Sequence, residues 1–300
     1  MIVKKIVITS GIYKDQELRL LVSFDENNKP LDLINLNITK IGEVHIATVE
    51  KVLNDIDACI VKMDSGDKGF IENKKLRPDF FIEKHSEKKL VCQSDKFYVQ
   101  ISQDRKGVKP YSCNFIESDS KFSSTYGFIN YYFDKYTDKD CEIITDIEDY
   151  IIQEFNDSKI SIRKYEDEDI SLWNLYGLSG LLDKISSKVV HLKSGANLII
   201  EPTEAMTIVD VNSSKNYGKS TPLETNVEAL EELSRQLRLR SISGIIILDL
   251  LKISKKQEEM LIEDAKDLFK NDISIIQIHG FTNLGLLELT RSRCFAPINI

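Results

Sequence analysis

The chain has 300 residues, with 48 acidic against 40 basic side chains, and therefore a formal net charge of −8. Its 42% hydrophobic and 29% charged residues are typical of a protein that buries a core, and the length predicts two or three domains. No apolar run approaches the roughly 18 residues of a membrane-spanning helix, the N-terminus lacks a secretory pattern, and the five cysteines contain no C-x-x-C pair. We therefore expect a cytoplasmic protein with no membrane partner, disulfide framework or structural zinc, and the net charge alone counts against a nucleic-acid partner.

The acidic excess is confined to one stretch of the chain. Residues 134–169 hold thirteen Asp or Glu against five Lys or Arg, which accounts for the whole net charge. Residues 36–110 hold fourteen basic against twelve acidic side chains, with several lysines towards the end of that range. Charge runs usually mark solvated surfaces. The local balance nevertheless leaves room for a basic face, so a nucleic-acid partner is not excluded.

The first 190 residues are predicted to be rich in short strands. Residues 1–35 contain three β-prone runs, and residues 36–110 contain five more, the last two at 89–93 and 97–102. Five short strands in such a stretch indicate a small barrel such as an OB-fold. Residues 111–190 are predicted to hold a helix around 146–155 and an amphipathic helix over 171–190 that carries the single tryptophan, Trp173.

From about residue 191 strands and helices alternate, which predicts an α/β domain with a mixed or largely parallel sheet. Thr221 to Glu224 have the spacing of a capping box with Pro at the first helical position, so a helix is expected from Thr221 to Ser243-Gly244. The continuously apolar run at 244–250 is typical of a strand in a sheet covered on both faces. The other expected strands are 196–201, 205–211 and 272–279, and the other expected helices are 255–272 and 283–293.

Two aspartates end apolar strands of this region. Asp210 and Asp249 each stand at the carboxyl end of a strand, the edge at which open α/β sheets bind ligands. Because side chains alternate along a strand, Asn212 points the same way as Asp210. Converging carboxylates and an amide suit Mg²⁺, which prefers oxygen ligands and can activate water and stabilise charge on a phosphodiester. The alternative is that each aspartate only caps the loop or helix that follows.

Three arginines, Arg235, Arg238 and Arg240, lie at the end of the helix between those aspartates. Cations at this position complement the helix dipole and its free carbonyls. The functional interpretation is that they hold phosphate groups close to the metal. The spacing of the arginines alone does not decide between the structural and the functional interpretation. His191 and His279 are isolated, without a partner at a ligand or catalytic spacing, and are expected to be structural.

Several motifs of this region resemble the ribonuclease E/G family. They are Glu204–Ser213 (EAMTIVDVNS), Thr225-Asn226, Arg235–Arg240 (RQLRLR), Ser243–Asp249 (SGIIILD) and Leu284–Arg291 (LGLLELTR). In that family the aspartate of the D-x-N-S motif and the aspartate ending the later strand bind the catalytic Mg²⁺, and the asparagine assists. The resemblance implies these roles for Asp210, Asp249 and Asn212. It also implies that Arg235, Arg238 and Arg240 form the family's basic segment.

The resemblance continues more faintly towards the N-terminus. The segment from Ile41 to Ile71 is similar to the family's inserted OB-fold module, in which Phe70 matches an aromatic residue that stacks on RNA bases and Ile60 replaces a second one. Lys106 and Lys109 match a segment whose basic residues contact RNA. This implies a ribonuclease H-like domain interrupted by an OB-fold β-barrel and followed by a DNase I-like α/β catalytic domain. The expected boundaries are 1–35 for the first ribonuclease H-like part, 36–110 for the barrel, 111–190 for a connecting segment and the second part, and 191–300 for the catalytic domain.

The sequence also departs from the family pattern. Between Phe122 and Asp140 it shows no counterpart of the family's 5′-sensor segment, and we expect neither the family's C-P-x-C zinc link nor the small domain that follows it. Residues 215–219 replace a glycine-rich loop, and Asn283 replaces a basic residue. These departures leave dependence on the RNA 5′ end undecided and count against full catalytic efficiency, and we expect an oligomer that is not linked by zinc.

The sequence predicts a Mg²⁺-dependent endoribonuclease, with Mn²⁺ as a substitute, that cleaves single-stranded RNA in RNA processing or decay, ribosomal RNA being one candidate. One alternative is an RNA-binding protein of the same family, associated with the ribosome, that has lost turnover. The missing sensor segment, Ile60 and Asn283 favour it, and the intact set of Asp210, Asn212 and Asp249 counts against it. A third interpretation, an unrelated α/β phosphohydrolase of small molecules, leaves the barrel without a role.

Overall fold

The computed structural model describes residues 3–87, 90–104, 109–117, 132, 137–148, 161–213, 220–296 and 298. The chain forms two units: unit 1 comprises Met1–Asn37, Asp138–Arg293 and Pro297–Ile300, and unit 2 comprises Ile38–Thr137 and Cys294–Ala296. Unit 2 is thus inserted into the sequence of unit 1. Most of the helix expected over 146–155, the replaced loop at 215–219 and much of the acidic stretch lie outside the described residues.

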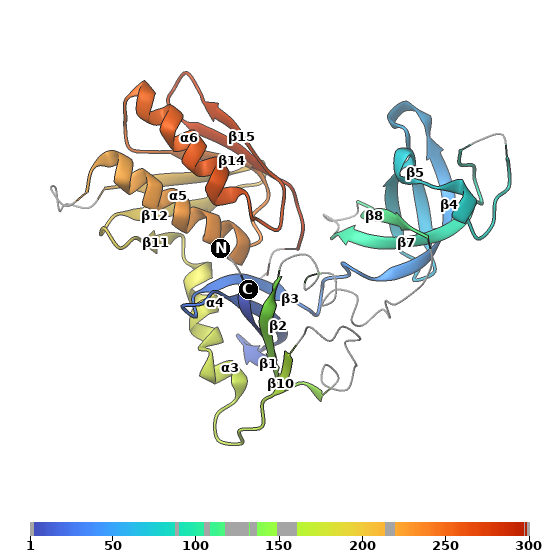
Figure 1. Ribbon diagram of the computed structural model, residues 1–300, viewed down its shortest axis with the longest axis horizontal. Coiled ribbons are helices and arrows are strands. Elements are labelled where there is room, and N and C mark those ends of the chain that lie inside the picture. Colours follow the sequence, from blue (N-terminus) through green and yellow to red (C-terminus); the bar gives the residue numbers. More distant parts are fainter. Residues whose placement is uncertain are drawn as a thin grey trace. The chain divides into compact units, whose positions relative to one another are not determined.

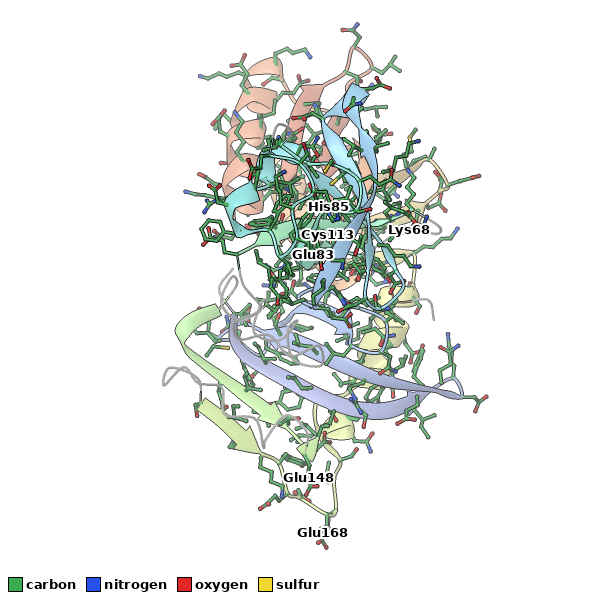
Figure 2. The ribbon with its side chains drawn as sticks, turned by 90° about the vertical axis from the view of Figure 1, so that its right-hand side faces the viewer. Lys68, Glu83, His85, Cys113, Glu148 and Glu168 are labelled. Carbon is green, nitrogen blue, oxygen red and sulfur yellow. The ribbon has the colours of Figure 1, made fainter. Side chains whose placement is uncertain are left out.

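Unit 2 contains a closed five-stranded barrel (Figure 1). In spatial order the strands are β4 (Val44–Leu53), β5 (Ala58–Met63), β6 (Lys68–Glu72), β8 (Tyr111–Ile116) and β7 (Lys96–Gln103). Alternate side chains fill the interior, among them Val61 and Phe97, which are fully buried. At Gly69 any Cβ would lie within 3 Å of side-chain atoms of Val61 and Cys113, of which Cys113 is labelled in Figure 2, so a glycine is required for the strands to approach there.

The barrel expected from the sequence is confirmed, but one of its strands was wrongly placed. Leu90–Gln93 do not form a strand, and the fifth strand is β8, beyond the expected boundary at residue 110. The reason is the buried carboxylate of Asp95, which accepts backbone N–H groups from His85 and Cys92 at 2.7 and 2.8 Å and folds the segment into a turn. Short 3₁₀ turns complete the connections at Asn54–Ile56, Asn73–Lys75 and Pro78–Phe80.

Unit 1 begins with a five-stranded sheet to which both sides of the insertion contribute. Its order is β10 (Ser161–Lys164), β9 (Thr137–Thr145), β1 (Val3–Tyr13), β2 (Gln16–Phe24) and β3 (Pro30–Asn35). Two helices, α3 (Leu172–Leu175) and α4 (Leu178–Ser186), pack against its core through Trp173 and Leu182. The single helix expected over 171–190 is therefore two, because Gly177 adopts a left-handed backbone with φ of +59° between them.

Unit 1 continues with a six-stranded mixed sheet. Its order is β11 (Val189–His191), β12 (Asn197–Pro202), β13 (Met206–Asn212), β14 (Gly244–Asp249), β16 (Leu287–Arg291) and β15 (Ile276–Phe281). Only β13 and β14 pair in parallel. The expected capping box at Thr221 and Glu224 is present and begins helix α5 (Pro222–Leu239), and α6 (Lys255–Phe269) follows β14.

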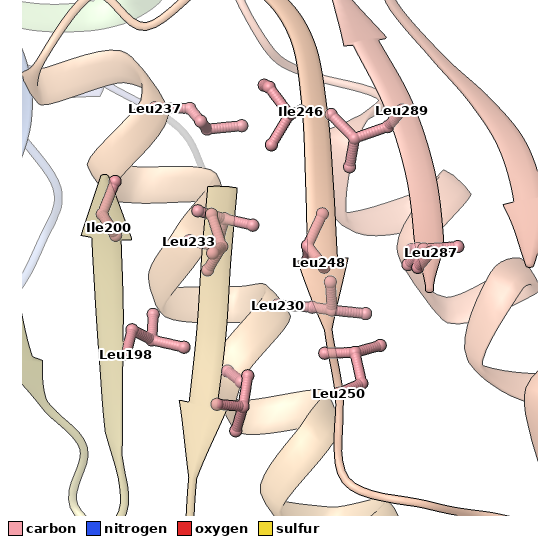
Figure 3. Close-up of a cluster of buried hydrophobic side chains, with 14 of the residues drawn as sticks. Leu198, Ile200, Leu230, Leu233, Leu237, Ile246, Leu248, Leu250, Leu287 and Leu289 are labelled. Carbon is pink, nitrogen blue, oxygen red and sulfur yellow. The ribbon is translucent and has the colours of Figure 1, made fainter. Parts of the chain in front are cut away.

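Helices α5 and α6 cover one face of this sheet. Leucine and isoleucine side chains of α5, β12, β14 and β16 interdigitate beneath them (Figure 3). The opposite face is not covered in the described chain, since Ile208 is 43% and Ile245 is 46% exposed. The expectation that the strand at 244–250 is covered on both faces is therefore wrong. Only alternate residues of that strand, such as Ile246 and Leu248, reach the helices.

The helix expected over 283–293 is also wrong, because this segment forms strand β16. Leu287, Leu289 and Arg291 are buried and alternate with the half-buried Glu288 and Thr290. The alternation fits a strand with one face on the core, and β16 pairs with both β14 and β15. In the part of the chain that is described, no helix is long and apolar enough to cross a membrane.

Candidate active site

Asp210 and Asp249 are direct neighbours on adjacent strands. Strands β13 and β14 pair in register from Met206 with Ile245 to Asp210 with Asp249. Because the two strands are parallel, their carboxyl ends meet at the same edge of the sheet, and each aspartate is the last or nearly the last residue of its strand. The structure thus brings together the two carboxylates that the sequence indicated.

The alternation of side chains places both carboxylates on the open face of the sheet. Val209 and Leu248, which precede the aspartates, point to the helices and are buried, whereas Asp210 is half-buried and Asp249 is exposed. Hydrogen bonding between the strands fixes the backbone on which both side chains stand. The pair is therefore positioned by regular structure and not by a loop.

Asn212 lies two residues beyond Asp210 on the same face. Its Nδ2 donates a hydrogen bond to Asp210 Oδ2 at 2.7 Å, which restrains the carboxylate beside Asp249. The position of Asn212 agrees with the strand periodicity from which it was predicted. The three side chains form one row at the edge of β13 and β14, which we call the aspartate edge.

The chemistry of the aspartate edge suits a cation with oxygen ligands. Like charges placed directly opposite each other on neighbouring strands repel and destabilise the sheet. A cation between Asp210 and Asp249 would remove this repulsion. Within the described residues no three His, Cys, Asp or Glu side chains converge on a metal position. Two carboxylates and an amide oxygen remain, and Mg²⁺ commonly uses one or two carboxylates while keeping several waters. The donor set therefore fits Mg²⁺.

Asn226 holds the backbone next to the aspartate edge, which the sequence did not predict for it. It is fully buried on α5, where its Nδ2 donates to Leu251 O at 2.8 Å and its Oδ1 accepts from Leu251 N at 3.0 Å. Both bonds hold the backbone two residues after Asp249. The signal in the sequence was the Thr225-Asn226 motif, since an amide on the buried side of a helix must find partners.

Arg238, expected to contact RNA, is instead buried in unit 1. Its side chain is 3% exposed, and its Nε and Nη2 donate to the two carboxylate oxygens of Asp32 on β3 at 2.7 and 2.6 Å. Asp32 is itself fully buried. This geometry favours a structural role for Arg238, because its Nε and Nη2 are bonded to a buried carboxylate on a strand and do not face the solvent.

The other two arginines lie beside it on the same helix end. Arg235 pairs with Glu232 and donates to Pro30 O at 3.4 Å. Arg240 donates through Nε to Gln236 at 2.7 Å, and burial lowers the pKa of its guanidinium to about 10. All three arginines are thus engaged within unit 1, and none is paired with Asp210 or Asp249.

The barrel carries the predicted aromatic residue on its outer surface. Phe70 of β6 is half-buried and lies directly across from Ile60 of β5, so the two positions form one small platform. The next outward pair is Lys62 with Lys68. Both are exposed, and Figure 2 labels Lys68. These lysines were missed from the sequence, because only the strand register shows that they adjoin the platform. Lys109 is exposed, and Lys106 lies outside the described residues.

A model of the ribonuclease E/G family matches residues 83–294, which is more than half of the chain. The chain belongs to the ribonuclease E/G family. Among similar proteins are ribonuclease G of Haemophilus influenzae, 35% identical over 127 residues, and ribonuclease E of Synechocystis sp., 40% identical over 131 residues. Ribonuclease E of Nostoc sp. is 42% identical over 109 residues.

These matches cover parts of both proteins. They extend over 41%, 42% and 35% of this chain and over 26%, 19% and 16% of the three relatives, in the same order. The chain thus matches at most about a quarter of each of these ribonucleases. Family membership agrees with the resemblance drawn from the D-x-N-S motif and the segments around it.

Proposed function

We propose that the protein is a Mg²⁺-dependent endoribonuclease that cleaves single-stranded RNA at the aspartate edge. The observation that carries this proposal is the in-register pairing of Asp210 with Asp249, with Asn212 bonded to the first of them. Membership of the ribonuclease E/G family supports the reaction class. The proposed metal is inferred from the oxygen ligands at the aspartate edge, and the proposed substrate from the surface of the barrel.

Each residue of the edge has a distinct part in this mechanism. Asp210 and Asp249 would hold the metal ion through their carboxylate oxygens, and Asn212 keeps Asp210 in the orientation that this requires. When bound, Mg²⁺ supplies an activated water and offsets negative charge on the phosphodiester. The half-buried Asp210 and the exposed Asp249 leave the edge open to a phosphate of an extended strand.

The barrel would hold the RNA strand by stacking and by charge. Phe70 offers an aromatic face, and base stacking on such a face contributes about 1–3 kcal/mol per base. Ile60 beside it offers apolar contact without stacking, so the platform is weaker than one with two aromatic residues. Lys62 and Lys68 would contact phosphates next to the platform. In fold terms we assign the barrel as an OB-fold, the five-stranded sheet as ribonuclease H-like and the six-stranded sheet as DNase I-like.

The decisive experiment replaces Asp249 by asparagine, which keeps the shape of the side chain and removes its charge. A labelled, A/U-rich single-stranded RNA is incubated with the wild type and with Asp249→Asn, with Mg²⁺ or with EDTA. We expect product only from the wild type in Mg²⁺, whereas both proteins bind the RNA with the same affinity. A matched control is Asp264→Asn, an exposed position on α6 that is outside the aspartate edge.

Two outcomes would count against the proposal. Unchanged cleavage by Asp249→Asn would remove the aspartate edge from the mechanism. Binding of RNA without any product from the wild type in Mg²⁺ or Mn²⁺ would favour an RNA-binding protein without turnover.

A further inference from the structure

A cavity of about 730 Å³ lies in unit 1, and none of its lining residues belongs to the aspartate edge. Its walls come from the turn between β2 and β3, the segment from Tyr176 through α4, strand β11 with Lys193 after it, and helix α5. Figure 1 shows α4 next to β11 and α5. The volume is in the range of small-molecule sites, and the proposed cleavage reaction makes no use of it.

The lining of the cavity is strongly basic. Four cationic side chains and one carboxylate line it, a net charge of +3 within a chain of net charge −8. They are Lys29, Lys184, Lys193, Arg235 and Glu232. Burial by itself would raise the pKa of Glu232, but hydrogen bonds from Arg235 and Gln236 and the charge of Lys29 outweigh it and lower that pKa. The single carboxylate is therefore ionised and already bound by Arg235 and Lys29.

Two lysines remain available for an anion. Lys184 of α4 and Lys193 after β11 are exposed, and neither forms an ion pair with any described carboxylate. Glu228 accepts the backbone N–H of Lys193 at 2.7 Å and so fixes the turn that carries this side chain. Both lysines thus line the cavity, Lys184 from a helix and Lys193 from an anchored turn.

The interior of the cavity is apolar and partly aromatic. Phe24, Ile185 and Leu239 are buried and form part of its lining. The ring of Tyr176 packs against Phe24 with centroids 5.1 Å apart, and Lys5 Nζ lies 5.7 Å from the Tyr176 ring centroid. A flat apolar body would find van der Waals contact here that a simple inorganic anion would not.

Gly180 keeps one wall of the cavity open. Gly180 and Lys184 are four residues apart on α4 and therefore share one side of that helix, and Tyr176, which precedes α4, also lines the cavity. A glycine within a helix lowers its stability, and no neighbour requires one here, since a Cβ at Gly180 would meet nothing within 4 Å. The missing side chain leaves the space in front of Gly180 open.

We propose that this cavity binds a small phosphomonoester with an aromatic body, of the nucleoside monophosphate class. Lys184 and Lys193 bind the phosphate, and the base lies along Gly180 against Tyr176 and the apolar lining. The inference does not depend on the proposed nuclease reaction, because none of these residues lies at the aspartate edge.

The test measures binding of adenosine 5′-monophosphate to the full chain by calorimetry at low salt in EDTA. Saturable binding of one equivalent is expected, with adenosine and inorganic phosphate each binding about tenfold or more weakly. The paired change Lys184→Gln and Lys193→Gln should weaken binding by about tenfold or more, the size of one charge-assisted hydrogen bond. Gly180→Leu should abolish it by filling the cavity.

The matched control is Lys188→Gln. Lys188 is an exposed lysine between α4 and β11 that pairs with Glu201 at 2.9 Å, and it does not line the cavity. It should leave the affinity unchanged. The lysine variants keep the test valid if Gly180→Leu fails to fold, which circular dichroism reports. Absence of saturable binding, equal binding of adenosine, or unchanged affinity in the lysine variants would overturn the proposal. The proposal would also be overturned if the protein bound a short RNA duplex but not the nucleotide, and if the lysine variants lost that duplex binding.

Discussion

Unit 1 carries charged side chains in two contrasting settings. At the aspartate edge Asp210 and Asp249 have the same charge, lie side by side and are open to solvent, and neither pairs with a described cation. Near the end of α5, Arg238 and Asp32 have opposite charges and are almost completely buried. The first arrangement is electrostatically incomplete without a cation, whereas the second is complete within the protein. The type of a residue therefore indicates its chemical role only when its burial and its bonding partners are also known.

The largest effect should come from breaking the buried pair. Arg238→Ala removes the cation that pairs with the buried carboxylate of Asp32, and such a change costs about 3–5 kcal/mol in the free energy of unfolding. Urea denaturation of the purified variant measures this. The control is Arg163→Ala, which removes an arginine that pairs with Glu142 on the surface at 2.8 Å and should cost about 1 kcal/mol or less.

The same variant separates the structural from the RNA-binding role of Arg238. If this arginine contacts phosphate, Arg238→Ala should weaken RNA binding and leave the unfolding transition where it is in the wild type. That pattern would contradict a structural role for Arg238. Loss of stability together with wild-type RNA affinity, measured below the unfolding transition, would support it.

Local patterns in the sequence were sufficient for the aspartate edge. Strand periodicity placed Asp210 and Asn212 on one face, and the apolar runs before Asp210 and Asp249 marked two strand ends that prove to be neighbours. The partner of Arg238 could not be found in this way, because Asp32 lies 206 residues earlier in the chain. No local pattern reports a pairing across that separation.

The errors in the fold have the same physical origin. The leucines of 283–293 fit a helical as well as an alternating pattern. The segment forms strand β16 because it pairs with β14 on one side and with β15 on the other. The apolar strand β14 likewise does not show from its own residues that one face is left open. In both cases tertiary neighbours decide what the local pattern leaves undecided.

A smaller effect is expected at Asn226, which links the two settings because it is buried and supports the aspartate edge. Asn226→Ala removes both hydrogen bonds to Leu251 and should lower the free energy of unfolding by about 1–3 kcal/mol. It should also slow RNA cleavage, since the backbone after Asp249 is no longer held. Asn174→Ala, at an exposed helical asparagine, should change stability by about 0.5 kcal/mol or less. Wild-type cleavage by Asn226→Ala would show that this anchor does not position the edge.

The smallest effect has the opposite sign and tests the exposed pair directly. In EDTA, Asp249→Asn removes the repulsion between neighbouring carboxylates on β13 and β14 and should raise the free energy of unfolding by about 0.2–1 kcal/mol. In Mg²⁺ the order should reverse, because only the wild type gains binding energy, about 1.4 kcal/mol at a concentration ten times the dissociation constant. Urea denaturation in the two buffers measures both signs. If Asp249 served only to cap its loop, the same substitution would lower stability in EDTA and Mg²⁺ alike, and the contrast between an edge that awaits a cation and a pair that needs none would fail.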